Sequence, residues 1–253
     1  MKFSLPHCSP QEKRNFFTGI LTSPGADLRF RELAERGELQ TLFPEIHAMI
    51  GVTQPPEFHP EGDVFEHTML MLHHMAYPDP LLGWSVLLHD VGKPLTRSVE
   101  LSGRIRFFNH EVKGAEMARE ILRGMAFPEE EINIVVHAVK NHMRFAYVTE
   151  MRRAKVEALL DNPYFGLELE LHRLDCISCH GKMSCFDFLL ARLAERTAPV
   201  QSLISGKVLT ALGIAPGKQM GEILKTVEKL RLAGKINAPE QALEYVVNLK
   251  NKE

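Results

Sequence analysis

Hydrophobic and polar residues follow a helical rhythm along nearly the whole chain. Apolar residues recur every three or four positions, as they do on one face of an α-helix, and strand-like alternation is almost absent. Prolines, glycines and capping residues interrupt the pattern and mark where helical stretches end. The pattern predicts helices within residues 29–46, 64–76, 80–90, 110–125, 128–143, 150–160, 164–180, 185–197, 217–233 and 238–253. The expected fold class is therefore all-α.

Two segments depart from this rhythm. Residues 51–63 are rich in proline and glycine and are predicted to form a loop. Residues 95–108 show no helical periodicity, and Ser102-Gly103 offers a turn near their centre. This second segment is therefore either an extended loop or a small hairpin.

Composition narrows the class of protein. Of the 253 residues, 45% are apolar, which is typical of a globular chain with a packed core. The formal net charge of −2 argues against strong attraction of the whole molecule to nucleic acid but leaves room for a local basic patch. The N-terminal residues show no export signal, and no run approaches the roughly 18 apolar residues of a membrane span. We expect a soluble, cytoplasmic protein without a membrane partner.

The helix predicted at residues 80–90 ends on an unusual pair. His89 and Asp90 stand side by side after an apolar run, and Gly92 and Pro94 then stop the helix. Adjacent helical residues point about 100° apart, so both side chains can face one point only at a helix end. Imidazole and carboxylate groups are both good ligands for divalent transition metals. The pair is therefore a candidate part of a metal site.

Four further residues of these kinds lie on other predicted helices. His67 lies in the helix at 64–76, and His110 begins the helix at 110–125. His142 closes the helix at 128–143, and Asp175 lies within the helix at 164–180. Bundles commonly build metal sites from such side chains on facing helices. We therefore expect one site formed by His67, His89, Asp90, His110, His142 and Asp175.

The order of these residues resembles the ligand order of the HD superfamily of metal-dependent phosphohydrolases. The segments that carry the resemblance are HPEGDVFEHTML, LLHDVGKP, FFNHEVKGAEMA, NHMRF and LDCISCHG. More narrowly, LFPEIHAMIGVTQPPEFHPEGDVFEHTML and LTALGIAPGKQMGEIL are similar to the HD-bearing, C-terminal part of bacterial CCA-adding tRNA nucleotidyltransferases. With the shift in composition near residue 200, the resemblance implies an N-terminal helical segment at 1–50, an HD helical bundle at 51–204 and a small helical tail at 205–253.

The resemblance also implies how the ligands divide between two divalent ions. One ion would be held by His67, His89, Asp90 and Asp175, and the other by Asp90, His110 and His142. In such sites the ions activate a water and stabilise charge on phosphoryl oxygens. Whether one or two ions bind stays open, as does their identity among Fe, Mn, Zn, Co, Ni and Mg, although an imidazole-rich set disfavours a pure magnesium site.

Lys93 lies just beyond the His-Asp pair. Its point charge suits a phosphate oxygen, so Asp90 and Lys93 are the expected catalytic residues. A solvated lysine in a turn is the alternative interpretation of Lys93.

Three functions remain open at this level. The favoured one is a metal-dependent phosphohydrolase acting on a nucleotide or RNA-end phosphate, either a 2′,3′-cyclic phosphodiester or a phosphomonoester. The second is a hydrolase of dinucleoside polyphosphates or a deoxynucleotide phosphatase. The third is a tRNA- or RNA-binding accessory protein that partners a separate nucleotidyltransferase. The complete set of six residues favours an enzyme over the third function.

The two ends of the chain differ in what they imply. Residues 1–30 hold no glycine-rich strand with paired carboxylates, so we do not expect nucleotide addition by this chain alone. Residues 205–253 carry eight Lys/Arg and five acids, a net charge of +3. The corresponding region of CCA-adding enzymes contacts tRNA, so RNA is an expected partner beside a nucleotide or phosphorylated small molecule. A plain helical subdomain is the alternative.

Cys176-x-x-Cys179-His180 matches a haem-attachment motif when taken alone. It falls inside a predicted helix of a chain without an export signal, so haem attachment is disfavoured. A zinc site that includes Cys185 would have to form across Gly181. We expect these thiols to be buried or incidental.

Overall fold

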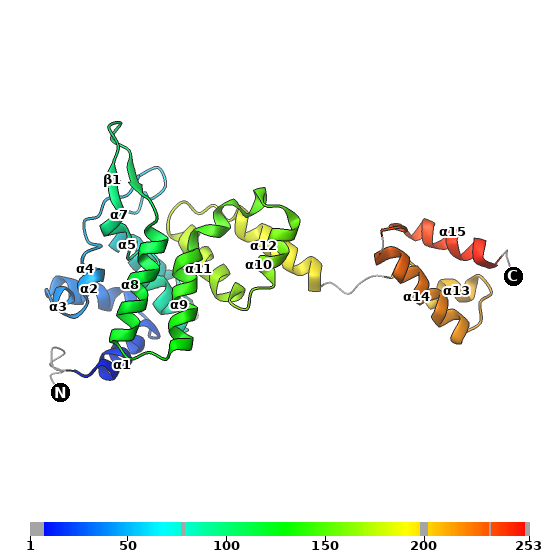
Figure 1. Cartoon of the computed structure of the whole chain (residues 1–253), viewed down its shortest axis with the longest axis horizontal. Helices are drawn as coiled ribbons and strands as arrows, with labels where there is room; N and C mark the ends of the chain where they lie inside the picture. The colour runs from blue at the N-terminus through cyan, green and yellow to red at the C-terminus, as the bar shows by residue number, and fades with distance from the viewer. Residues whose placement is uncertain (1–7, 77–78, 198–201, 233, 251–253) are drawn as a thin grey trace. The chain divides into compact units, whose positions relative to one another are not determined.

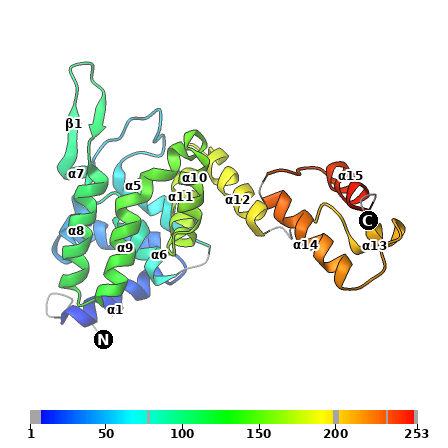
Figure 2. The ribbon, with the colours of Figure 1, turned by 45° about the vertical axis from the view of Figure 1, so that its right-hand side comes forward.

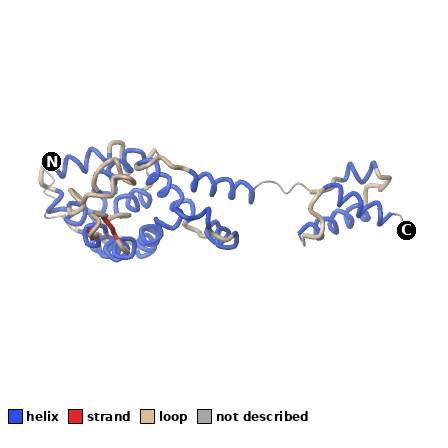
Figure 3. The backbone as a smooth tube through the Cα atoms, turned by 90° about the horizontal axis from the view of Figure 1, so that it is seen from above, coloured by secondary structure: helices blue, strands red, loops and turns tan. Residues whose placement is uncertain are grey.

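The computed structural model describes residues 8–76, 79–197, 202–232 and 234–250. Within these ranges the chain is built almost wholly from helices, and one short hairpin is the only sheet (Figures 1 and 3). The prediction of an all-α helical bundle with a small C-terminal helical subdomain is confirmed. The chain divides into two compact units, Met1–Ala194 and Glu195–Glu253.

The first unit contains two groups of elements. Those that precede the hairpin are α1 (Pro10–Leu21), α2 (Ala26–Glu35), α3 (Leu39–Leu42), α4 (Pro44–His47), α5 (Val64–His74), α6 (Pro80–Leu88) and α7 (Lys93–Thr96). The hairpin strands are β1 (Arg97–Val99) and β2 (Ile105–Phe107). Those that follow are α8 (His110–Gly124), α9 (Glu129–Asn141), the 3-10 helix η2 (His142–Glu150), α10 (Arg153–Leu160), α11 (Phe165–Ser178) and most of α12 (Ser184–Thr197), whose last residues belong to the second unit.

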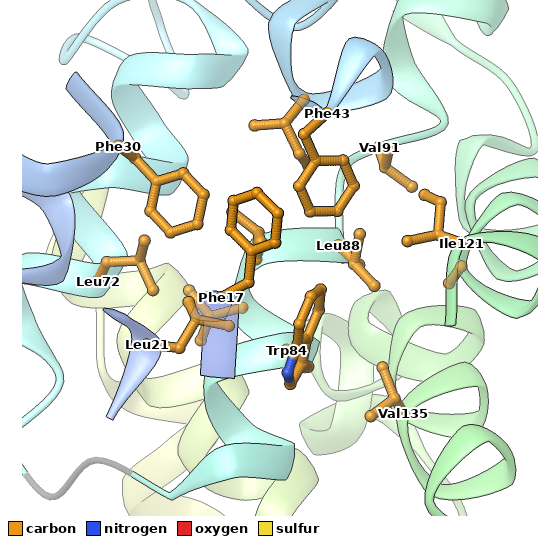
Figure 4. Close-up of a cluster of buried hydrophobic side chains, with 14 of the residues drawn as sticks. Phe17, Leu21, Phe30, Phe43, Leu72, Trp84, Leu88, Val91, Ile121 and Val135 are labelled. Carbon is orange, nitrogen blue, oxygen red and sulfur yellow. The ribbon is translucent and has the colours of Figure 1, made fainter. Parts of the chain in front are cut away.

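Helix α6 forms the centre of the main core. Asp79 accepts a hydrogen bond from the Leu82 amide at its start, and Pro80 occupies the first turn, so both residues favour helix initiation there. Nearly every later residue of α6 is buried because α1, α5, α9 and α11 all pack against it. Trp84 lies among aromatic and aliphatic side chains from several helices, and its indole Nε1 donates to Thr18 Oγ1 at 3.0 Å (Figure 4). This packing gives the end of α6 a rigid foundation.

The segment at 95–108 adopts the hairpin rather than the loop. Arg97 pairs with Phe107 and Val99 with Ile105 in an antiparallel register. Gly103 has a φ of 83°, a left-handed conformation that glycine adopts without steric cost. The hairpin projects beyond the helices in two views of the molecule (Figures 1 and 2).

Two predicted helices differ from the structure: one is divided into three, and the other begins later than predicted. The stretch at 29–46 becomes α2, α3 and α4, because Gly37 takes a left-handed φ of 68° and Pro44 starts a new turn. The stretch at 150–160 begins only at Arg153, because residues 142–150 form the tighter 3-10 helix η2.

The second unit holds α13 (Gly206–Ala211), α14 (Lys218–Leu232) and α15 (Pro239–Lys250). Its own apolar cluster is centred on Leu209, Val227 and Val246. Six lysines stay exposed around this core: Lys207, Lys218, Lys225, Lys229, Lys235 and Lys250. Among the described residues of both units, no helix combines the length and apolar character needed to cross a membrane.

Candidate metal centre

The end of α6 explains how His89 and Asp90 face the same point. His89 caps the C-terminal end of α6 and keeps helical backbone angles, and the chain then turns through hydrogen bonds from Val91 N to Leu88 O and from Lys93 N to Asp90 O. The turn at Gly92 lies directly against the backbone of α8, where a Cβ would overlap the carbonyl oxygen of His110. Glycine therefore permits the close approach that brings the His-Asp pair next to His110.

The other predicted residues arrive from four separate elements. His67 lies on α5 and is fully buried. His110 opens α8, His142 opens η2, and both are at least nine-tenths buried. Asp175 lies on α11, and its side chain is 24% exposed.

Asp90 is the common member of two groups of possible ligands. In one group, ligand atoms of His67, His89 and Asp90 all lie within 4.8 Å of one another. In the other, the same holds for Asp90, His110 and His142. Asp175 extends the first group, since its Oδ1 lies 3.1 Å from His67 Nε2. The cluster could hold a metal ion, and all six predicted residues belong to it.

Each of the four imidazoles is held by its Nδ1 atom. The Nδ1 atoms of His89, His110 and His142 lie 2.8, 2.8 and 2.7 Å from the carbonyl oxygens of Val86, Phe107 and Val139. A carbonyl only accepts, so each of these Nδ1 atoms carries the proton. In the neutral ring the lone pair is then on Nε2, the atom that points into the cluster.

The donor set fits a bound cation. His110 Nε2 and His142 Nε2 face each other at 3.2 Å, although both are lone-pair atoms in the neutral rings. His89 Nε2 likewise lies 3.1 Å from Asp90 Oδ2, another acceptor. Within the described part of the chain, His89 Nε2 and Asp90 Oδ1 are buried without a hydrogen-bond partner. Such orphaned acceptors are costly unless a cation or donor satisfies them.

Electrostatics keep His142 and Asp90 in forms that bind metal, whereas His67 must first lose a proton. Burial lowers the pKa of His142 to about 3, so this ring is neutral at pH 7. Burial alone would raise the pKa of Asp90, but the neighbouring His89 and Lys93 outweigh it and hold that pKa well below its usual range. Burial also opposes the charged form of His67, yet the carboxylates of Asp175 and Glu61 raise its pKa to about 9. A cation at His67 would therefore displace a proton.

Lys93 is buried beside the cluster rather than solvated. Its Nζ lies 2.6 Å from Asp90 Oδ2 and donates to Gln54 Oε1 at 2.7 Å. An ammonium group has three donors, so one remains for a further acceptor.

Sequence reasoning missed two residues that support the cluster. Glu61 accepts hydrogen bonds from Nδ1 of both His67 and His59, at 2.6 and 2.9 Å. Gln54 orients Lys93. Both lie in the loop 51–63, which is held in place because Asp63 accepts from Gly51 N and Glu66 N. Their sequence positions give no periodic signal, because a loop brings them to the site.

The cysteines take no part in the groups of possible ligands found among the described residues. Cys176 and Cys179 border a cavity that also reaches the candidate ligands, and burial raises the pKa of both thiols to about 12. They are therefore protonated at neutral pH. Cys176 is buried, as expected, whereas Cys179 and Cys185 are half-buried.

The cluster lies at the floor of a cavity of about 540 Å³. His89, Asp90, His110, His142 and Asp175 all border it. This volume is within the usual range of small-molecule sites, roughly 300–1,000 Å³. A ligand in the cavity can therefore reach the cluster directly.

Comparison with known proteins agrees with this geometry. Residues 64–166 match the HD domain family. The chain thus contains a segment that is similar to HD domains. The chain is similar over most of its length to tRNA nucleotidyltransferases, which confirms the resemblance carried by the ligand segments.

Three relatives illustrate the extent of the match. The A-adding tRNA nucleotidyltransferase of Deinococcus radiodurans is 32% identical over 262 residues, which cover 96% of this chain and 59% of that protein. The CC-adding tRNA nucleotidyltransferase of Thermus thermophilus is 30% identical over 249 residues, covering 90% and 54%. A multifunctional CCA protein of Acinetobacter baumannii is 32% identical over 137 residues, covering 53% and 32%. The chain thus spans little more than half the length of the first two relatives.

Proposed function

We propose that the protein is a metal-dependent phosphohydrolase that acts on a nucleotide or RNA-end phosphate, either a 2′,3′-cyclic phosphodiester or a phosphomonoester. The observation that carries this proposal is the set of buried, unsatisfied Nε2 atoms around Asp90 at the floor of the cavity. The HD domain supports the class of reaction. The named activity of the relatives on tRNA supports a nucleotide-containing substrate.

The chain's own residues would share the work as follows. One divalent ion would be held by His67, His89, Asp90 and Asp175, and a second by Asp90, His110 and His142. Divalent ions in such a site supply an activated water and neutralise charge on phosphoryl oxygens. The Nδ1 hydrogen bonds fix the imidazoles in the tautomer that offers Nε2. Lys93, held by Asp90 and Gln54, would direct its remaining donor to a phosphate oxygen.

The decisive experiment removes the His-Asp pair. His89→Ala and Asp90→Ala should abolish hydrolysis of phosphoesters and lower the metal content measured by elemental analysis. His73→Ala provides a matched control, because His73 lies on α5 with a side chain 64% exposed. Full activity in either variant of the pair would refute the site.

The number of ions has a separate test. His110→Ala should leave about half of the bound metal if two ions bind, because only the second group loses a ligand. An unchanged stoichiometry would indicate a single-ion site.

A second candidate function is RNA binding as an accessory protein. It rests on the six exposed lysines of residues 205–250 and on the tRNA-related names of the relatives. If the metal-loaded protein hydrolyses no phosphoester but binds tRNA at low salt, this function is favoured over the first.

A further inference from the structure

The buried cluster of candidate metal ligands forms the floor of the cavity, and the exposed residues that border the cavity form its mouth. The two parts differ in chemistry. Apart from Asp90 and Asp175, the residues that border the cavity in the described part of the chain include no acid. Arg104, Arg106 and Lys182 also border it. The whole chain carries a net charge of −2, so this positive lining is a local feature of the cavity.

Two of these cations are available to a ligand. Arg106 is engaged by Glu100, whose Oε1 lies 2.9 Å from its Nε. Arg104 and Lys182 are exposed, and no carboxylate within ion-pair distance is seen for either among the described residues. Arg104 precedes strand β2, and Lys182 lies in the connection between α11 and α12. The positive charge therefore comes from two separate segments of the chain.

Large apolar side chains are exposed at the same mouth. Phe58 is 50% exposed, Met143 43% and Tyr147 64%, although all three border the cavity. Phe58 lies in the loop 51–63, whereas Met143 and Tyr147 lie on η2. Exposed aromatic groups beside a concave site mark a surface that a ligand covers.

Exposed aromatic side chains beside unpaired cations match the chemistry of single-stranded nucleic acid. Unpaired bases stack on aromatic side chains, while cations bind successive backbone phosphates. A mononucleotide would bring one phosphate group, which the floor with Lys93 already serves. Arg104 and Lys182 then remain for phosphates further along a chain.

Resting on the proposed hydrolase function, we infer that the substrate is the single-stranded end of an RNA chain rather than a free nucleotide. The terminal phosphate would lie at the floor. The terminal bases would stack on Tyr147 and Phe58, and the preceding phosphodiesters would pair with Arg104 and Lys182.

The test compares substrates that share one reacting group. The metal-loaded full chain is given a short single-stranded RNA with a 2′,3′-cyclic or 3′-phosphate end, and the mononucleotide with the same end. Wild type should show a kcat/KM at least about tenfold higher for the oligonucleotide, because one stacked base contributes about that factor. Equal values for the two substrates would overturn the inference while leaving the hydrolase proposal intact.

Substitutions of residues at the mouth then show which side chains cause the preference for the oligonucleotide. Tyr147→Ala should lower the ratio of the two kcat/KM values about tenfold. Arg104→Gln and Lys182→Gln should each reduce the slope of log affinity against log salt by about 0.7. Phe108→Ala and Lys155→Gln are matched controls, since both residues are exposed but do not border the cavity. A preference that responds alike to mouth and control variants would also overturn the inference.

If the protein hydrolyses no phosphoester, RNA binding at the mouth can still be tested. If no phosphoester is cleaved, the hydrolase proposal fails, and fluorescence anisotropy of the labelled 3′-phosphate oligonucleotide measures binding instead. The lysines of residues 205–250 stay intact in every variant. Weaker binding by Tyr147→Ala than by Phe108→Ala would support the mouth as the RNA site, and equal binding would reject it.

Discussion

At the scale of single residues, the four imidazoles of the cluster are oriented in two ways. His89, His110 and His142 each use a backbone carbonyl three residues earlier in the chain. His67 instead uses the carboxylate of Glu61. A carboxylate partner makes an imidazole a more basic ligand than a carbonyl partner does. His67 is therefore the one imidazole of these four whose Nδ1 hydrogen bond depends on another side chain.

We expect Glu61→Gln to weaken metal binding about 10–100-fold, the usual effect of losing such a partner. Competition with a chelator of known affinity measures the change, and it needs no substrate. Glu57→Gln is the matched control because Glu57 lies exposed in the same loop. Equal metal affinity in the two variants would show that Glu61 does not orient His67.

The depressed pKa of His142 predicts an acid-dependent loss of stability. In the folded, metal-free protein this pKa is about 3, whereas an unfolded histidine titrates near about 6.5. The unfolded state therefore binds more protons in between. The stabilising contribution is complete above pH 6.5 and declines as the pH falls towards 3.

His142→Gln should flatten this part of the profile. We expect the free energy of unfolding of the metal-free variant to fall less steeply between pH 6.5 and 4.5 than that of wild type, as measured by urea unfolding with chelator present. His73→Gln is the control for loss of an exposed imidazole. Parallel profiles for wild type and His142→Gln would contradict the assignment.

At the scale of elements, the junction between α6 and α8 decides the geometry of the cluster. The apolar run, His89-Asp90, Gly92 and Pro94 are visible in the sequence, and they correctly predict where α6 ends. The close approach of Gly92 to the start of α8 is not visible, because it depends on which helix packs there.

Gly92→Ala should disturb both stability and the site. Its Cβ would overlap His110 O and lie 2.6 Å from Gly114 N, both backbone atoms that move only if α8 moves. We expect a loss of about 1–3 kcal/mol in the free energy of unfolding, together with weaker metal binding. Gly19→Ala, in α1 where nothing beyond the adjoining helix backbone lies within 4 Å of the new Cβ, should be neutral or stabilising by up to about 1 kcal/mol. Similar losses in both variants would argue against a specific contact at Gly92.

The helices themselves were largely predictable, and the errors have local causes. Amphipathic spacing located α5, α8, α9, α14 and α15, and a short, almost continuous apolar run located α6. The same spacing ran through Gly37 in the stretch 29–46, because apolar periodicity does not register a left-handed glycine. Near residue 150 it missed η2, because 3-10 and α-helical periods are too close to separate over nine residues.

At the scale of the whole molecule, the two compact units have separate apolar cores. All candidate ligands lie in the first unit. We expect calorimetry to show two unfolding transitions, and added metal to raise the midpoint of only one, because metal stabilises the unit that binds it. A chelator should reverse the shift. A single transition that moves as a whole would show that the units unfold together.

The residue types at the cluster were readable from the chain alone because metal ligation needs particular atoms, and few side chains supply them. The amphipathic pattern likewise determined the helical class, since burial of one helix face is a local property of residue spacing. Only the tertiary structure decided how the ligands group around Asp90, that Glu61 and Gln54 complete the site, and that Phe58, Tyr147, Arg104 and Lys182 border one cavity. Those relations join residues far apart in the chain, and packing between elements sets such distances, which no local pattern records.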